Sequence, residues 1–174
     1  MSQENVENIQ TLGGIRYRVT PASRANQRRP LDEHFYARFP AAYRLLADRL
    51  SRLPPRSRIR RSLIGLRVRR ANAAYNRRDF EAVALGWAPG VEYRPAPNLI
   101  IPDEGTVAHG HDGYLRRIRT WLDAFDDLRF DPEEVIDFGD KVLVTVRWTG
   151  HGSGSGVPMS GQLFQLYTLR LGLV

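Results

Sequence analysis

One short segment combines residue types that could do acid–base chemistry or bind a metal. His109 and His111, followed by Asp112, place two imidazoles and a carboxylate within four residues. An imidazole titrates near neutral pH, so either histidine could act as a general base. The same three groups are metal ligands, but alternate residues share a face only in a strand, and a loop entering a helix is predicted here. We therefore predict no metal and no cofactor. The competing interpretation is a helix start, in which Asp112 complements the helix dipole and His111 packs locally.

Two carboxylates on predicted strands complete the set of candidate catalytic residues. Glu92 and Asp137 would each be an acid with a raised pKa if the strand buried them. The competing interpretation is that each is a solvated strand carboxylate. The candidate catalytic residues are thus Glu92, His109, His111 and Asp137.

Aromatic and amide side chains could line a pocket for an apolar molecule. Ligand pockets commonly combine aromatic walls with a few polar groups. The candidate ligand-binding residues are Trp87, Tyr93, Trp121, Trp148, Gln165 and Tyr167. Ordinary core or interface positions are an equally good interpretation of each.

A β-hairpin between Glu133 and Gly152 is the clearest structural feature of the sequence. Gly139-Asp140 separates two runs rich in β-branched residues, which is a hairpin signal. After this turn, apolar side chains alternate with partly polar ones. One face of the second strand is wholly apolar and should face a core or a pocket; it comprises Val142, Val144, Val146 and Trp148.

Helical spacing of apolar residues dominates the first half of the chain. An amphipathic helix is predicted over 31–53, with Pro40 as the start of a second segment, and Pro54-Pro55 ends it. Further helices are predicted over 57–76, 80–87 and 113–125, the first two capped by Ser57 and Asp79. Strands are predicted at 91–94, 128–130, 134–138, 142–150 and 159–170, and Leu99–Ile101 is read as a brief strand or a plug.

The composition is that of a globular protein. The chain has 174 residues, of which 42% are hydrophobic and 26% charged, and no cysteine. No apolar run approaches the roughly 18 residues that span a bilayer. The first residues lack the positive start and apolar stretch of a secretory signal, so we expect a cytoplasmic protein.

Charge divides the chain into a basic and an acidic half. Residues 1–78 hold 18 Arg and 5 acidic residues, a net of +13, whereas residues 79–174 hold 8 basic and 14 acidic residues, a net of −6. The arginines of 56–61 and 67–70 could contact nucleic acid or an anionic membrane. No nucleic-acid fold signature accompanies them. We favour attraction between the two halves of one chain, which requires no partner.

The order of motifs in the second half resembles the SnoaL-like group of the nuclear transport factor 2-like superfamily. The matching residues are Tyr75, Asn76, Asp79, Phe80, Trp87, Val91, Gly110, His111, Asp112 and Gly113. The resemblance implies an α+β fold in which a curved antiparallel sheet forms a cone round helices, with an apolar pocket at the wide end. It also implies a homodimer through the open face of the sheet.

Two departures from the family pattern matter. The steroid-isomerase branch carries a tyrosine and an aspartate base where this chain has Ala71 and Pro95, so the resemblance does not imply that chemistry. The family usually continues beyond a turn like Leu171–Val174 into another long strand. We therefore expect a truncated chain, or an edge that a second copy covers.

Three regions and one leading function follow. Residues 1–30 are expected to be a disordered or loosely attached tail, 31–65 a basic helical arm, and 66–174 a SnoaL-like cone domain.

The leading hypothesis is a small-molecule pocket protein, either an isomerase, a cyclase or a hydrolase that uses acid–base chemistry without a cofactor. The rival is a non-catalytic ligand-binding or dimerisation module. A third makes the basic arm a membrane or RNA contact. An enzyme should place one of the four candidate catalytic groups in the pocket.

Overall fold

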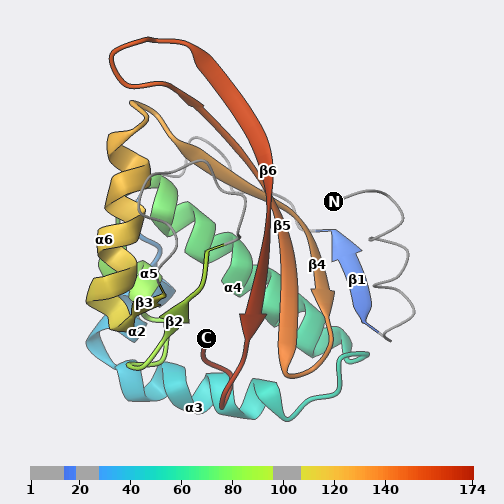
Figure 1. Ribbon diagram of the computed structural model, residues 1–174. Helices are drawn as coiled ribbons and strands as arrows, with labels where there is room; N and C mark the ends of the chain where they lie inside the picture. Colours follow the sequence, from blue (N-terminus) through green and yellow to red (C-terminus); the bar gives the residue numbers. More distant parts are fainter. Residues whose placement is uncertain (1–13, 19–27, 96–106) are drawn as a thin grey trace.

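The protein is described by a computed structural model in which residues 14–18, 28–95 and 107–174 are placed (Figure 1). Leu99–Ile101 lies outside these residues. The helices are α2 (Leu31–Arg38), α3 (Pro40–Ser51), α4 (Arg58–Asn76), α5 (Phe80–Ala84) and α6 (Gly110–Asp123). The strands are β1 (Ile15–Arg18), β2 (Glu92–Tyr93), β3 (Ala108–His109), β4 (Arg129–Asp137), β5 (Lys141–His151) and β6 (Pro158–Thr168).

An antiparallel sheet in the order β1-β4-β5-β6 forms one layer, and the helices form the other (Figure 1). Strands β2 and β3 make a separate two-stranded ribbon. The predicted α+β class with an antiparallel sheet is confirmed. The cone shape and the absence of a last strand stay predictions.

The alternation predicted for β5 is confirmed by burial. Val142, Val144 and Val146 are 3%, 1% and 0% exposed and belong to the core that the helices cover. Because side chains alternate across a strand, their neighbours in sequence lie on the other face of the sheet. The hairpin turn is also confirmed: Gly139 has a φ of 102°, a conformation that favours glycine.

Proline and capping residues set the helix boundaries as predicted. Pro40 begins α3, directly after α2 ends. The Ser57 hydroxyl accepts a hydrogen bond from the Arg60 amide at the start of α4, and the Asp79 carboxylate accepts one from the Ala82 amide at the start of α5. These side chains satisfy amide groups that the first helical turn leaves without a backbone acceptor.

Strand β1 lies in the segment predicted to be a loose tail. Ile15 and Tyr17 pair with Asp137 and Val135 of β4, so residues 15–18 form the edge of the sheet. The pairing joins residues more than a hundred positions apart, and four residues are too few to give a clear alternation in the sequence. The predicted division into tail, arm and domain otherwise stays a prediction.

A buried ion pair fastens α4 to the β4–β5 turn. Arg60 and Asp137 are both 0% exposed, and the Arg60 Nε and Nη2 atoms donate to the two Asp137 carboxylate oxygens at 2.7 and 2.9 Å. The same guanidinium donates to the carbonyls of Leu50, Ser51 and Leu53 and to that of Gly139. One side chain therefore joins the end of α3, the start of α4 and the hairpin turn.

A second ion pair attaches Arg29, which precedes α2, to α5. Arg29 donates to both carboxylate oxygens of Asp79, and its Nη2 atom also contacts Glu81 at 2.8 Å. The hydrogen bonds from Arg29 are the largest cause that holds the pKa of Asp79 below its ordinary value. A carboxyl with a depressed pKa in the fold stabilises it above the pKa of the unfolded chain, and this stabilisation is lost as the pH falls through the folded pKa.

We predict that Asp79→Asn lowers the free energy of unfolding by about 1 kcal/mol at pH 7, since asparagine keeps the helix cap but not the charge. Urea unfolding should show the difference from wild type shrinking as the pH falls below the ordinary aspartate value. Asp140→Asn, at an exposed position, is the matched control. A difference that persisted unchanged in acid would contradict the electrostatic origin.

None of the described helices is both long and apolar enough to cross a membrane. The cytoplasmic location stays a prediction.

Candidate ligand cavity

A cavity of about 150 Å³ lies where the arm meets the core. Its walls come from α2, α3 and α4, the segment 83–87, the end of β6 near the start of β5, and residues 169 and 174. The lining residues are Asp32, Glu33, Tyr36, Tyr43, Ile64, Leu66, Arg67, Val68, Arg70, Ala71, Asn72, Tyr75, Val83, Leu85, Gly86, Trp87, Val142, Tyr167, Leu169 and Val174. Most of this lining is apolar or aromatic, as is usual for sites that bind small organic molecules.

The last residues of the described chain close one side of the cavity. The Val174 amide donates to the Gly86 carbonyl at 3.0 Å, and its own carbonyl accepts from the Ala88 amide at 2.8 Å. Leu173 is 8% exposed, and Arg170 forms a bridge with it across a tight turn. These bonds hold Leu169 and Val174 in the cavity wall.

A cluster of aromatic rings forms the inner wall. Trp87 lies edge-on to Tyr114, with ring centroids 3.9 Å apart, and 6.5 Å from Tyr75. The hydroxyls of Tyr75 and Tyr114 share a short hydrogen bond, and burial raises the pKa of both. Tyr167 donates to Gln165 Oε1 at 2.6 Å, and burial raises its pKa as well. All three phenols are therefore neutral at physiological pH and can only donate or accept hydrogen bonds.

Charged residues from α2 and α4 form a polar corner of the cavity. Arg77 Nη2 donates to Glu33 Oε2 at 2.5 Å, and Arg70 Nη2 donates to Asp32 at 3.1 Å. Arg70 Nε and Glu33 Oε1 are 4.0 Å apart, and among the described residues neither buried atom has a hydrogen-bond partner. Burial raises the pKa of the Glu33 carboxyl, against the opposing effect of Arg77 and Arg70.

Arg67 contributes a cation to the cavity wall. Its Nε atom donates to the Tyr43 hydroxyl at 2.9 Å, and its guanidinium carbon lies 5.3 Å from the centroid of the Tyr43 ring. Within the placed residues, no carboxylate forms an ion pair with it. The ring and the hydroxyl of Tyr43 hold the guanidinium in place from one side.

None of the four candidate catalytic residues belongs to the lining of this cavity. Glu92 and His109 face each other across β2 and β3, are 46% and 68% exposed, and approach to 3.7 Å. His111 lies in the first turn of α6, where its Nε2 atom is 3.1 Å from the Ala88 carbonyl oxygen. Asp137 is the buried partner of Arg60. The structure therefore brings Glu92 and His109 together and separates them from Asp137.

The described residues contain no group of three or more His, Asp or Glu side chains that could hold a metal ion. His109 and His111 have separate surroundings. The helix starts at Gly110, and His109 is its N-terminal flanking residue, with an extended backbone.

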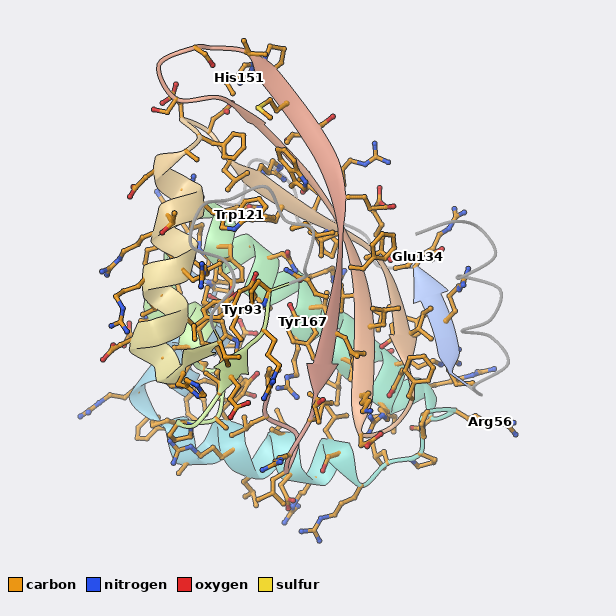
Figure 2. All side chains as sticks on the ribbon, in the orientation of Figure 1. Arg56, Tyr93, Trp121, Glu134, His151 and Tyr167 are labelled. Carbon is orange, nitrogen blue, oxygen red and sulfur yellow. The ribbon has the colours of Figure 1, made fainter. Side chains whose placement is uncertain are left out.

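Two of the six predicted ligand-binding residues line the cavity, namely Trp87 and Tyr167. Figure 2 shows Tyr93, Trp121 and Tyr167 in the space between the sheet and the helices, whereas Glu134 and His151 lie outside it. Trp121 and Trp148 contact each other edge-on, with ring centroids 6.2 Å apart, near the end of β5 that lies away from the Gly139 turn. Gln165 acts as the acceptor for Tyr167 without itself lining the cavity. The binding roles of these residues stay predictions.

The lining residues on α2, α3 and α4 were not among the predicted binding residues. Ile64, Arg67, Val68, Ala71 and Tyr75 follow one another at helical steps of one, three or four, so one face of α4 supplies a continuous wall. This helical spacing could have predicted that one face of α4 lines a cavity. No such pattern marked Glu33, because its burial becomes visible only in the fold, where it contacts Arg77 and Arg70.

Several residues of the sequence motif have structural roles. Asn76 Nδ2 donates to the Phe130 carbonyl at 2.9 Å, and its Oδ1 accepts from the Phe130 amide at 2.8 Å. This pair of bonds joins the end of α4 to β4. Asp79 caps α5, as described above.

The chain belongs to the SnoaL-like domain family, whose sequence profile matches residues 68–174. The recognition made from the sequence motifs is confirmed. The match begins inside α4. Five cavity residues that carry polar groups precede the matched residues, namely Asp32, Glu33, Tyr36, Tyr43 and Arg67.

Solved structures with the nuclear transport factor 2-like fold are similar to this chain. One is a protein of unknown function from Burkholderia pseudomallei, with a TM-score of 0.56 and 23% identity over 62% of this chain and 82% of that one. Another is TerC co-crystallised with polyporic acid, with a TM-score of 0.55, 23% identity and the same coverage. A third, described as a SnoaL-like polyketide cyclase from Jannaschia sp., has a TM-score of 0.57 and 21% identity over 70% of this chain and 85% of that one. At these identities the similarity shows the fold. No curated protein matches the chain.

Proposed function

We propose that this protein binds a small ring-bearing organic molecule in the cavity between α2, α4 and the end of β6. The observation that carries the proposal is the lining itself: aliphatic side chains and four tyrosines surround a space of about 150 Å³, with polar groups gathered in one corner. An aromatic wall favours flat rings, and a few polar atoms fix their orientation. The co-crystallisation of TerC with polyporic acid supports testing that compound first.

Acid–base catalysis in the same cavity is a second candidate function. It would make the protein an isomerase, a cyclase or a hydrolase without a cofactor. Glu33 supports it, because its Oε1 atom has no hydrogen-bond partner among the described residues and burial raises its pKa. A carboxyl whose pKa burial raises above its ordinary value holds a proton more readily, which favours a role as general acid or base. The proposal differs from the sequence analysis, which assigned this role to Glu92, His109, His111 or Asp137.

Filling the cavity is the direct test of binding. Ala71 lies in the α4 wall, so Ala71→Phe places a phenyl ring in the space that a ligand would occupy. Titration of a panel of ring-bearing molecules, followed by intrinsic tryptophan fluorescence and thermal shift, should find at least one ligand for the wild type. We expect Ala71→Phe to bind it at least about tenfold more weakly, the equivalent of about 1.4 kcal/mol.

Ala41→Phe is the matched control, because Ala41 is exposed on α3 and does not line the cavity. It should bind as the wild type does. Equal binding by Ala71→Phe in a normally folded protein would place the ligand elsewhere and contradict the proposal.

The outer face of the sheet supports the expected homodimer. Phe164 and Leu166 of β6 are 38% and 60% exposed, on the face opposite to the core. A second copy could cover them. Light scattering coupled to size exclusion gives the mass directly, and Leu166→Arg should shift a dimer towards the monomer.

A further inference from the structure

We propose that the ligand of this cavity is an organic anion and that Arg67 binds its acidic group. The inference rests on the proposed small-molecule function and narrows it to ring-bearing carboxylic acids and similarly acidic molecules. It also assigns a specificity residue that lies just before the residues matched by the family profile, 68–174.

The charges around the cavity are compensated with one exception. Asp32 pairs with Arg70, and Glu33 pairs with Arg77, with Arg70 Nε at 4.0 Å. Arg67 faces the same cavity, but in the part of the chain that the structure describes its only hydrogen bond goes to the neutral Tyr43 hydroxyl. A cation beside an apolar surface is strengthened as an anion-binding group, because water competes poorly there.

Among the described residues, the two terminal guanidinium nitrogens of Arg67 have no hydrogen-bond acceptor. Tyr43 occupies the Nε atom at 2.9 Å and supports the guanidinium through its ring. No described residue accepts a hydrogen bond from the two terminal nitrogens, which can therefore both donate to one carboxylate. The aromatic and aliphatic wall of Tyr75, Trp87 and Val142 would contact the rings of the same molecule. A carboxylate attached to an apolar ring system fits this division into a cationic corner and an apolar wall.

Two molecules of nearly equal shape, one charged and one neutral, separate the contribution of charge to affinity from that of shape. These are 2-naphthoate and the neutral 2-naphthamide, titrated calorimetrically into the full chain at low salt. The wild type should bind 2-naphthoate at least about tenfold more tightly, as expected for a hydrogen-bonded charge. Arg67→Gln should abolish this preference and leave the affinity for 2-naphthamide unchanged. Arg67→Lys should retain part of it, since lysine keeps the charge but not the fork.

Arg69→Gln is the matched control, because Arg69 is on the same helix but not in the cavity lining. It should keep the full preference. An Arg67→Gln protein that still prefers 2-naphthoate overturns the assignment of Arg67. Equal affinity of the wild type for both probes, or binding of neither, overturns the anion site. The panel of ring-bearing ligands then decides independently whether the cavity binds small molecules at all.

Discussion

Asp137→Asn is expected to lower the free energy of unfolding by about 3 to 5 kcal/mol, because it leaves the buried Arg60 guanidinium without a counter-charge. Both side chains are fully buried, and their two hydrogen bonds measure 2.7 and 2.9 Å. Asp137 also accepts a hydrogen bond from the Gly139 amide at 2.9 Å, which orders the hairpin turn. Urea unfolding followed by circular dichroism should show the midpoint fall, with the dependence on urea concentration little changed.

Arg52→Gln is the control for this prediction. Arg52 pairs with Asp48 at 2.7 Å, but its side chain is 74% exposed. An exposed pair contributes less than about 1 kcal/mol, so this variant should unfold close to the wild type. If Asp137→Asn lowered the free energy of unfolding as little as Arg52→Gln does, the buried ion pair would not hold α4 to the β4–β5 turn. The comparison also bears on catalysis, since loss of activity in an Asp137 variant would reflect loss of the fold.

Gly172→Ala is expected to detach the end of the chain from α3. A Cβ atom at Gly172 would overlap the backbone carbonyl of Ala47, which cannot move aside as a flexible side chain could. The φ of Gly172 is also +74°, a conformation that costs a residue with a side chain about 1 kcal/mol. Since Leu169 and Val174 line the cavity, the variant should bind ligands more weakly as well as unfold earlier.

Gly154→Ala separates these two causes. Gly154 has the same φ of +74°, but a Cβ atom there would meet nothing within 4 Å. We expect Gly154→Ala to lower the free energy of unfolding only by the cost of the unfavourable φ, about 1 kcal/mol, and to leave ligand affinity unchanged. Equal stability and equal ligand affinity of the two variants, measured by thermal unfolding and titration, would contradict the close contact with Ala47.

Local signals in the sequence predicted most elements, whereas contacts between distant residues had to be observed. Proline and capping residues determine where helices begin, so Pro40, Ser57 and Asp79 marked real boundaries. The pairing of Arg60 with Asp137 spans 77 positions and leaves no periodic pattern. The cavity could not be predicted for the same reason. In the sequence Glu33 resembles a solvated residue of a first helical turn, and only the fold shows that it is buried beside Arg70 and Arg77.

The candidate site shows the limit of judging residues by type. Histidines and strand carboxylates were candidate catalytic residues because their side chains can exchange protons. In the structure they lie on β2, β3 and α6, or form the buried ion pair with Arg60. The cavity lining instead contains Arg67 and Arg70, which the charge pattern attributed to attraction between the two halves of the chain. Arginine was abundant, so its presence carried little information. Among the described residues two arginines line the cavity, and Arg70 pairs with Asp32 whereas Arg67 has no ion pair.

Helix α4 makes the buried ion pair, the contact with β4 and the cavity depend on one another. The family profile starts at residue 68, in the middle of a helix that runs without interruption from Arg58 to Asn76. Its first half carries the Arg60 clamp, and its second half carries Asn76, which binds β4. One continuous helix therefore carries residues on both sides of the start of the profile match. A break in the middle of this helix would loosen the ion pair with Asp137, the contact with β4 and one wall of the cavity together.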